Sequence, residues 1–579
     1  MRRRFVPLCA LSFAALTISA QSADAQRVLG VGDDALVLPR GVLRIRVLQQ
    51  NTNFNERYGA GTFGRPDGAL EPLGIDFNLD TVGKTEFPAL GALETGIQRL
   101  TGMPDFRVSL GRTIVGSDVR VSATPVVVEA GVTSKLSLGV IVPYVRTRNE
   151  IFFNVNPDGR EGNVGFNPAN AGVVGTTFPG LIGAQDANRN VQAQFSAAAA
   201  QLQGTLDFCQ ANPAAGSCPM INAQRGNALA LIQNSTAFAG GLSQIYGDGT
   251  SFGSPFVPVA GSEAQQAIQA RIVAFNGLFG QFGVVNRLTA QPTSAPNRLG
   301  LSQAQQILTD PIFGVSGSPL QSTERSHIGD IEVGAKFAIF DTFGQDTRRR
   351  LNPTGLGLRA AVTGVVRLPT GQTDAPTSFV DVGTGQGQTD LEGRLSGDVV
   401  FTKFFWASFI TRYTIQMKDD QFVRILDAPN RTLAASYRQR RVERDLGDYY
   451  EFEMNPRVVL NDYFAIGGHY FYRQKEQDQY TGSFVVPAAE SGFDADPSTP
   501  ALDPITINAN ILNLETEQRE HRFGGGFSFS TVAAFDKGKA RLPLEITYLH
   551  FQTTRGEGNV PKLFSDQIQL RLYTRIFGN

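Results

Sequence analysis

The sequence is poor in cysteine, tryptophan and histidine, and it has no excess of charge of either sign. Its 579 residues contain three cysteines, one tryptophan and four histidines, and 52 basic side chains nearly balance 53 acidic ones. The formal net charge of -1 gives no support to nucleic-acid binding or to an acidic tail. Beyond the N-terminal region, no apolar run is long enough for a membrane-spanning helix, which takes about 20 residues. This absence excludes helical spans only, because a spanning β-strand needs only about 9–11 residues of alternating polarity.

The N-terminus has the pattern of a secretory leader. Met1–Arg4 is basic, Phe5–Ala20 is mostly apolar, and Ala23–Ala25 has the small-x-small pattern of a signal-peptidase site. We therefore expect residues 1–25 to be a signal peptide that is cleaved before Gln26. The alternative, an N-terminal anchor helix, is disfavoured because the apolar run is short and contains several hydroxyl side chains.

Only two cysteines remain after the leader. Cys209 and Cys218 lie nine residues apart in a segment rich in Pro, Ala and Asn. In an exported protein this spacing favours one local disulfide. A metal site is disfavoured because no histidine or further cysteine lies nearby.

Period-two alternation of apolar and polar residues is the strongest pattern in the chain. In Gln567–Phe577, for example, Ile568 and Leu570 alternate with Gln569 and Arg571. Such alternation predicts strands with one apolar and one polar face. The candidate strands are 41–50, 117–130, 135–148, 328–341, 355–368, 389–402, 404–417, 448–460, 463–475, 519–533, 541–553 and 563–577.

The connections between these strands alternate in length. Very short turns, such as Gly131–Ser134 and Asn461–Asp462, alternate with long connections, such as 51–116 and 149–327. A soluble sandwich has no reason to sort its connections in this way, whereas outer-membrane barrels do. We therefore predict an all-β fold: residues 26–579 form a transmembrane antiparallel β-barrel of about twelve strands in the cell outer membrane.

The longest connection is expected to carry helices. Residues 149–327 form an external insertion in which Asp186–Phe208 and Glu263–Phe279 are rich in Ala, Gln and Leu, residues that favour helices. Gln303–Leu308 is a further short candidate. The alternative is a partly disordered excursion, which the predicted disulfide disfavours.

The first long connection contains an apolar stripe at helical spacing. We predict that Phe87, Leu90, Leu93 and Ile97 form an apolar lip at the mouth of the barrel. The alternative is that this stripe simply packs against the barrel.

Charged residues on the polar faces of the strands are expected to line the lumen, because ionised groups are unfavourable against lipid. Acids and bases are interleaved, which suggests ion pairs between neighbouring strands. Such a lumen is either a polar pathway of mixed charge or a network that fills the barrel. The predicted lumen residues are Asp330, Glu332, Lys336, Arg359, Arg367, Asp390, Glu392, Arg394, Asp398, Arg412, Glu451, Glu453, Arg457, Arg473, Arg522, Glu545, Arg571 and Arg575.

Catalysis finds little support in the sequence. No Gly-x-Ser-x-Gly motif, phosphate loop or histidine pair with metal-ligand spacing occurs, although His469 is expected to face the lumen. Paired carboxylates such as Glu451 and Glu453 have an arginine nearby on the same face, which indicates salt-bridged strands. We therefore predict no catalytic residues, no metal site, no cofactor and no enzyme activity.

Four short segments carry a family resemblance. They read GVTSKLSLG at 131–139, GDIEVGAK at 329–336, RLPTG at 367–371 and GTGQGQTD at 383–390. In this order they resemble the outer-membrane proteins of meta-cleavage phenol degradation, which look related to the long-chain fatty-acid and aromatic-hydrocarbon channels. The resemblance implies a monomeric channel for small hydrophobic compounds.

The resemblance covers roughly 117–148 and 328–417, and the chain departs from the family pattern elsewhere. The connection 149–327 is far longer, Gln26–Gly41 looks too short for an N-terminal plug, and Phe577 is not the terminal residue. The sequence thus predicts an uptake channel for small, hydrophobic or aromatic solutes. Its partners would be the solute and the lipid and lipopolysaccharide of the outer membrane, with no nucleic acid. The alternative is a non-conducting barrel that displays 149–327 for binding or structural roles at the cell surface.

Overall fold

The computed structural model describes residues 34–575, except 62–65, 88–89, 160, 345–346, 352, 354, 403, 427–432 and 492–502. The predicted signal peptide therefore lies outside the described residues. The chain forms two compact units. We call them the barrel unit (Met1–Asp76, Val115–Phe152 and Leu320–Asn579) and the helical unit (Phe77–Ile114 and Phe153–Pro319).

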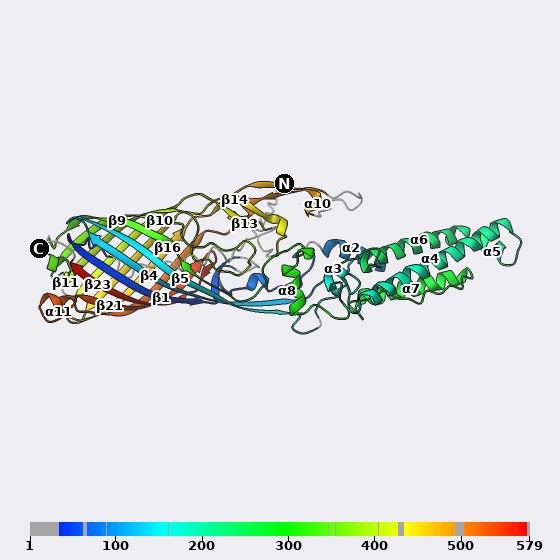
Figure 1. The fold of residues 1–579 in the computed structure, drawn as a ribbon, viewed down its shortest axis with the longest axis horizontal. Helices are drawn as coiled ribbons and strands as arrows, with labels where there is room; N and C mark the ends of the chain where they lie inside the picture. Colours follow the sequence, from blue (N-terminus) through cyan, green and yellow to red (C-terminus); the bar gives the residue numbers. More distant parts are fainter. Residues whose placement is uncertain are drawn as a thin grey trace, which may run out of the picture. The chain divides into compact units, whose positions relative to one another are not determined.

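Twelve antiparallel strands form the barrel, as the alternation predicted. Each pairs with its neighbours in the order β4-β1-β23-β21-β20-β16-β15-β12-β11-β10-β9-β5, and pairing of β4 with β5 closes the ring. Figure 1 shows these strands tilted side by side. Their bounds are β1 Val42–Phe54, β4 Thr113–Gly131, β5 Leu136–Val155, β9 Ile331–Asp341, β10 Gly357–Leu368, β11 Asp390–Thr402, β12 Phe405–Gln416, β15 Tyr449–Val459, β16 Phe464–Lys475, β20 Gln518–Ser530, β21 Leu544–Glu557 and β23 Phe564–Arg575.

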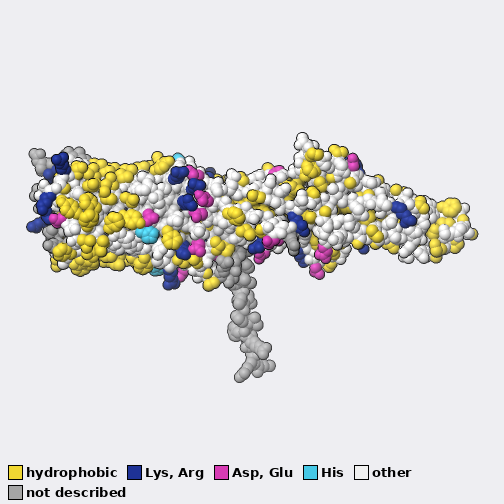
Figure 2. Space-filling model, turned by 90° about the horizontal axis from the view of Figure 1, so that it is seen from below, with side chains coloured by type: hydrophobic (Ala, Val, Ile, Leu, Met, Phe, Trp, Pro, Cys, Tyr) yellow, Lys and Arg dark blue, Asp and Glu magenta, His cyan; other side chains and the backbone are white. Residues whose placement is uncertain are grey.

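The two faces of the barrel wall differ as a membrane barrel requires. Along β23, Ile568 and Leu570 are exposed on the outside, whereas Gln567, Gln569 and Arg571 are buried on the inside. Figure 2 shows hydrophobic side chains gathered over this part of the molecule. An exposed apolar surface of this kind is stable against lipid and not against water. The barrel is therefore of the outer-membrane type.

Short turns join the strands at one end of the barrel, which we call the turn end, and long connections leave from the other, the loop end. At the loop end, β8 Thr323–Ile328 pairs with β5. Three small sheets add to it: β2 Glu56–Ala60 with β3 Asp67–Pro72 and β22 Val560–Pro561; β13 Asp419–Arg424 with β14 Gln439–Asp445 and β17 Gln479–Thr481; and β18 Ser483–Val486 with β19 Ile505–Asn508. The short helices of the barrel unit are α9 Thr347–Leu351, α10 Ala488–Ser491 and α11 Val532–Asp536.

The helical unit is built on three long helices that run alongside one another (Figure 1). Their facing apolar side chains form its core, in which the rings of Phe195, Phe238 and Phe275 lie 5.2–5.8 Å apart. No helix among the described residues is long and apolar enough to cross a membrane. The elements are α2 Leu90–Thr101, β6 Val164–Phe166, α3 Ala171–Val174, α4 Leu181–Ala211, α5 Cys218–Ala223, α6 Arg225–Tyr246, β7 Phe256–Pro258, α7 Glu263–Gln281 and α8 Leu301–Thr309.

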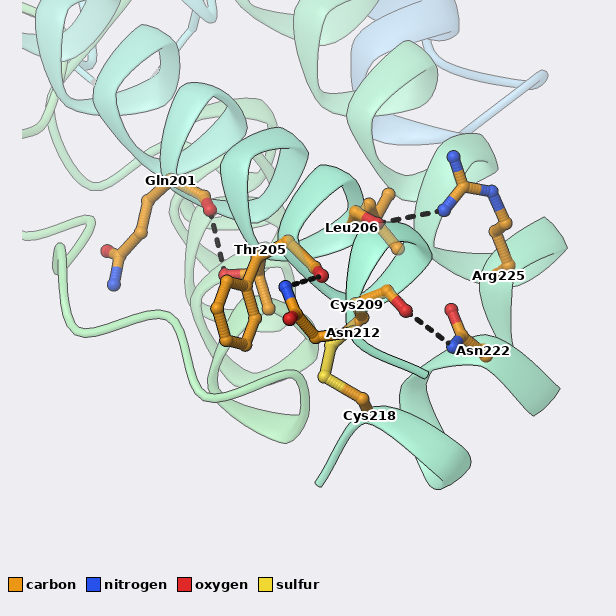
Figure 3. Close-up of a disulfide and its surroundings, with 9 residues drawn as sticks. Gln201, Thr205, Leu206, Cys209, Asn212, Cys218, Asn222 and Arg225 are labelled. Atoms are coloured by element: carbon orange, nitrogen blue, oxygen red, sulfur yellow. Dashed lines mark hydrogen bonds between the residues drawn. A yellow bond between two sulfur atoms is a disulfide. The ribbon is translucent and has the colours of Figure 1, made fainter. Parts of the chain in front are cut away.

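A disulfide braces the connection between α4 and α5. It joins Cys209 to Cys218, the pair that the spacing predicted (Figure 3). Around it, the Asn222 side chain donates to the carbonyl of Cys209 at 2.9 Å, and Arg225 donates to that of Leu206 at 3.0 Å. The first bond satisfies a carbonyl of the last turn of α4, which has no partner within the helix, and the second adds a contact to the preceding turn.

Candidate functional site

The interior of the barrel is lined by charged side chains, most of them at predicted positions. Thirteen of the predicted residues are buried: Lys336, Arg359, Arg367, Asp390, Glu392, Asp398, Arg412, Glu451, Glu453, Arg473, Arg522, Glu545 and Arg571. Glu332, Arg394 and Arg457 are partly buried. Arg575 is exposed instead, because it pairs with Val42 at the turn-end rim of β23, where solvent begins.

At the turn end, one set of ion pairs holds the N-terminal segment Asp34–Pro39 inside the barrel. Arg44, which is fully buried, donates to Glu129 at 2.5 Å and to Asp34 at 3.3 Å. The segment also reaches other strands, because Lys336 donates to the Asp34 carbonyl at 3.1 Å and the Ala35 amide donates to Asp398 at 3.1 Å.

The same segment packs its apolar side chains against the wall. Ala35 and Val37 lie with Ala338 and Ala361, and Leu36 and Leu38 pack in a cluster with Tyr573. Because these contacts involve strands from several sides of the ring, Asp34–Pro39 closes the turn end of the lumen. The interpretation that Gln26–Gly41 is too short for an N-terminal plug lies partly outside the described residues; its described part, from Asp34, is bonded to the inner wall.

Nearer the loop end, a second network links five neighbouring strands, β9, β10, β11, β12 and β15. Arg367 pairs with Asp390 at 2.5 Å and with Glu332 at 2.8 Å, and Arg394 pairs with Glu332 at 3.1 Å. Arg412 continues it with a 2.6 Å contact to Glu453. In buried ion pairs of this kind, each charge is tolerated only while its partner of opposite charge is present. The network therefore stiffens the wall and occupies part of the lumen.

The connection 369–389, between β10 and β11, folds into the barrel. Thr147 and Asn149 of β5 donate to the carbonyls of Val382 and Val380, each at 2.8 Å. Asp330 holds both halves of the connection, because its carboxylate accepts the amides of Gly371 and Gln386 at 2.9 Å. Asp330, predicted as a lumen residue of a strand, thus lies just before β9 and braces this connection.

Two glycines of the motif segments explain why the connection can fold so tightly. A Cβ atom on Gly371 would lie 2.5 Å from the Cα atom of Gly385, and one on Gly385 would lie 2.5 Å from the Asp330 carboxylate. Only glycine permits such a close approach of two backbones.

An apolar cluster lies on the inward faces beside this connection. Val382 belongs to the same cluster as Val145 of β5, Phe471 of β16 and Phe551 of β21. The cluster is formed by Phe54, Leu73, Val119, Val121, Ala123, Val145, Val382, Phe471, Leu549, Phe551 and Leu563, all buried. This apolar surface lies among charged groups, because the Arg522 guanidinium is 4.8 Å from the centre of the Phe471 ring and Glu453 is the strand partner of Phe471.

Two small cavities adjoin the inward faces. One, of about 120 Å³, is lined by Asp398, Arg457 and Glu545 and by Gly467, Gly468 and Gly526 of β16 and β20. The other, of about 50 Å³, is lined by Glu129, Lys336, Gly139 and Gly334. Both lie where glycines replace side chains in the wall.

Several lumen residues were missed at the sequence level. Arg44, Arg46 and Glu520 are buried on inward faces, and Glu129 pairs with the two arginines. Their signal was present, since Arg44 and Arg46 alternate with Leu43 and Ile45 in β1.

The apolar stripe of the first connection is placed differently from the predicted lip. Phe87, Leu90, Leu93 and Ile97 are all at most 5% exposed and belong to the core of the helical unit. The ring of Phe87 lies 6.5 Å from that of Phe256. The helical period was recognised correctly, and the stripe packs against the neighbouring helices α6 and α7.

The histidine singled out in the sequence lies on an inward face. His469 is buried, its Nδ1 atom lies 2.7 Å from the Asn455 amide oxygen, and its ring lies 5.6 Å from that of Phe551. Among the described residues, no group of three or more His, Cys, Asp or Glu side chains is arranged to hold a metal ion.

Comparisons with known proteins add only distant likenesses. No protein-family model matches the chain, and no curated protein matches it. An outer-membrane channel from Pseudomonas putida F1 is similar at 8% identity and a TM-score of 0.38, over 94% of this chain and 100% of that one. The Ralstonia pickettii toluene transporter TbuX is similar at 9% identity and a TM-score of 0.28, over 97% and 95%.

The translocator domain of the Neisseria meningitidis autotransporter NalP is similar at 6% identity and a TM-score of 0.27, over 96% of this chain and 92% of that one. TM-scores this low carry no argument about function. The assignment of the chain to the closed, twelve-stranded outer-membrane barrels thus rests on its own strand pairing and on the polarity of its two faces.

Proposed function

We propose that this protein is an outer-membrane channel for the uptake of small hydrophobic or aromatic solutes. The observation that supports it best is the apolar cluster around Val382, Phe471 and Phe551 inside the barrel. The interior of a water-filled porin is polar, whereas a solute without polar groups needs an apolar surface to leave water. Phenol-like compounds are the first candidates, in line with the sequence resemblance.

The two closures of the lumen are compatible with this function. Asp34–Pro39 and 369–389 are connecting segments and not wall strands, so both can move without breaking the barrel ladder. We propose that a solute enters past 369–389, contacts the apolar cluster and leaves after a local rearrangement. The barrel would act as a monomer in contact with lipid and lipopolysaccharide.

The test is uptake of radiolabelled toluene and phenol by proteoliposomes, with glucose as the polar reference solute. Uptake faster than in empty vesicles is expected for the aromatic solutes only. The variant Val382→Asp puts a charge into the apolar cluster. Toluene uptake should slow about tenfold, because a surface with an unpaired charge is less favourable for an apolar solute.

The matched control is Val485→Asp, in the strand β18, where the side chain is 72% exposed. It should leave uptake unchanged. Heat-modifiable migration on a gel establishes that each variant has folded. Uptake equal to that of empty vesicles by a folded protein would reject the proposal.

A second candidate is a non-conducting barrel that displays the helical unit. The observation in its favour is that two cavities beside the inward faces, of about 120 and 50 Å³, are small and share no lining residue. It predicts no conductance in a planar bilayer, both for the intact protein and after Val380–Gly383 is replaced by a short flexible linker.

A further inference from the structure

A large groove lies within the helical unit, between α2, α6 and α7. Its volume is about 940 Å³, in the range of pockets that hold small organic ligands. The floor is apolar and partly aromatic, made of the buried side chains Leu93, Leu100, Phe238, Ile245 and Phe275. The groove lies wholly within one compact unit and is separate from the barrel interior.

Small residues create the groove. A Cβ atom on Gly241 would lie 2.8 Å from a terminal carbon of Leu100, so α6 and α2 approach closely at that point. One residue earlier, a Cβ atom on Gly240 would meet nothing within 4 Å. Ala237 on α6 and Ala274 on α7 continue this open face. The helices are therefore held together on one side of the groove and leave space on the other.

The charges at the groove are all of one sign. Arg99 of α2 and Arg271 of α7 line it and are exposed, and no aspartate or glutamate is among its lining residues. Neither arginine forms an ion pair with another described residue. The Arg271 guanidinium lies 5.8 Å from the centre of the Phe275 ring, so cationic and aromatic surfaces meet.

The acidic residue nearest in sequence is already engaged elsewhere. Glu94 of α2 is buried, accepts the Val108 amide at 2.9 Å and pairs with Lys84 at 2.7 Å. It therefore does not neutralise Arg99 across the groove. Guanidinium groups beside an apolar floor match a ligand that has a carboxylate at one end of an apolar body.

We propose that this groove binds an amphipathic organic anion, with its apolar chain or ring on the Phe238–Phe275 floor and its carboxylate at Arg99 and Arg271. This goes beyond the proposed channel function and does not depend on it, because the site lies in the helical unit. The site also differs from the barrel cluster, where the Arg522 guanidinium beside Phe471 is paired with Glu520 at 2.6 Å.

Binding is tested with the full chain in nanodiscs of a zwitterionic phospholipid. The probe is a dansyl-labelled undecanoate, whose fluorescence rises in an apolar site, and empty nanodiscs give the background. We expect saturable binding with one site per chain. The methyl ester of the same probe has no charge and should bind about tenfold more weakly, because it loses the charge-assisted hydrogen bonds.

Two variants locate the site. Gly240→Phe fills the open space and should weaken binding at least tenfold, whereas Gly204→Phe, in open space on α4, should leave it unchanged. Arg99→Gln combined with Arg271→Gln changes only exposed side chains. This double variant should abolish the preference for the acid over the ester, and circular dichroism shows that its helices remain.

Three outcomes would overturn the proposal. They are acid binding that Gly240→Phe leaves intact, equal affinities for the acid and the ester in the unaltered protein, and concentration-dependent self-association that Gly240→Phe abolishes. The last would make the groove an interface between two copies. Toluene uptake measured on the same variants should not change, so failure of the groove proposal and failure of the channel proposal are distinguishable.

Discussion

Individual charged residues inside the barrel are held by partners on neighbouring strands or connections. Arg44 has no exposed surface and contacts carboxylates of two separate segments, Glu129 of β4 and Asp34 of the N-terminal segment. Removing one partner of such a residue is costly, because the buried charge keeps its desolvation penalty and loses the attraction that offsets it.

Removing the Glu129 carboxylate should therefore destabilise the barrel strongly. For Glu129→Ala we expect the free energy of unfolding to fall by about 3–5 kcal/mol, since the Arg44 guanidinium stays buried with only the 3.3 Å contact to Asp34. Urea unfolding in lipid vesicles, followed by tryptophan fluorescence, measures the change.

The control for this prediction is Glu324→Ala. Glu324 pairs with Arg146 at 2.7 Å, but both side chains are largely exposed, and such pairs contribute roughly 0–1 kcal/mol. Equal losses in the two variants would contradict the argument that burial decides the effect.

At the scale of elements, the strands were predictable and the inward connections were not. Alternation located all twelve barrel strands, because each has one lipid face and one interior face. The connection 369–389 has no such period. Its fold depends on contacts with β5, β16 and β21, which are distant in the sequence. The glycines of this segment therefore stand out in the sequence, but they do not predict that the segment folds into the barrel.

The helices show the same division. α4 and α7 were expected from Ala, Gln and Leu content, but α6 was not, because glycine, serine, threonine and asparagine interrupt its pattern. Packing against α4 and α7 compensates for these weak propensities. The groove between α2, α6 and α7 depends on those same small residues, so no local pattern could reveal it.

The connection 369–389 should loosen as the pH rises. Burial of the Asp374 carboxyl, together with the neighbouring Asp381, raises the pKa of Asp374 to about 8 from the usual 3.8. The Gly383 amide and the guanidinium groups of Arg325 and Arg444 act in the opposite direction. Because the pKa of Asp374 is raised in the folded state, its protonated carboxyl stabilises the folded connection fully below pH of about 4. This stabilisation is lost by pH of about 8.

Hydrogen exchange measures this effect on the amides of 380–386. After correction for the intrinsic rate, protection should fall between pH of about 5 and about 8. Asp374→Asn keeps the shape of the side chain without its charge and should make the fall in protection smaller, although burial also raises the pKa of Asp381 and of Asp330, which hold the same connection. Protection that falls equally in this variant would show that another group is responsible.

At the scale of the whole molecule, the barrel and the helical unit have separate cores and separate interactions. Every strand of the closed ring runs mainly through the barrel unit, and both closures of the lumen, Asp34–Pro39 and 369–389, belong to it. The disulfide and the groove belong to the helical unit. The chain thus combines a closed barrel with a second folded body inserted into two of its connections.

Replacing 80–110 and 156–318 by short Gly/Ser linkers should therefore leave a folded barrel. We expect heat-modifiable migration on a gel to persist, because the ladder hydrogen bonds that close the ring do not involve the removed residues. Planar-bilayer conductance should not increase, since both closures remain in place. Binding of the dansyl-labelled acid should disappear, because its site has been removed.

These three readouts separate the roles of the two units. If the shortened protein conducts where the intact one does not, the helical unit is itself a closure of the pore, and the closures inside the barrel are insufficient. If it fails to fold, the helical unit contributes to barrel assembly, and the separation of cores does not extend to folding. Only a folded, non-conducting barrel without acid binding agrees with a lumen closed from within and a ligand groove carried by the inserted body.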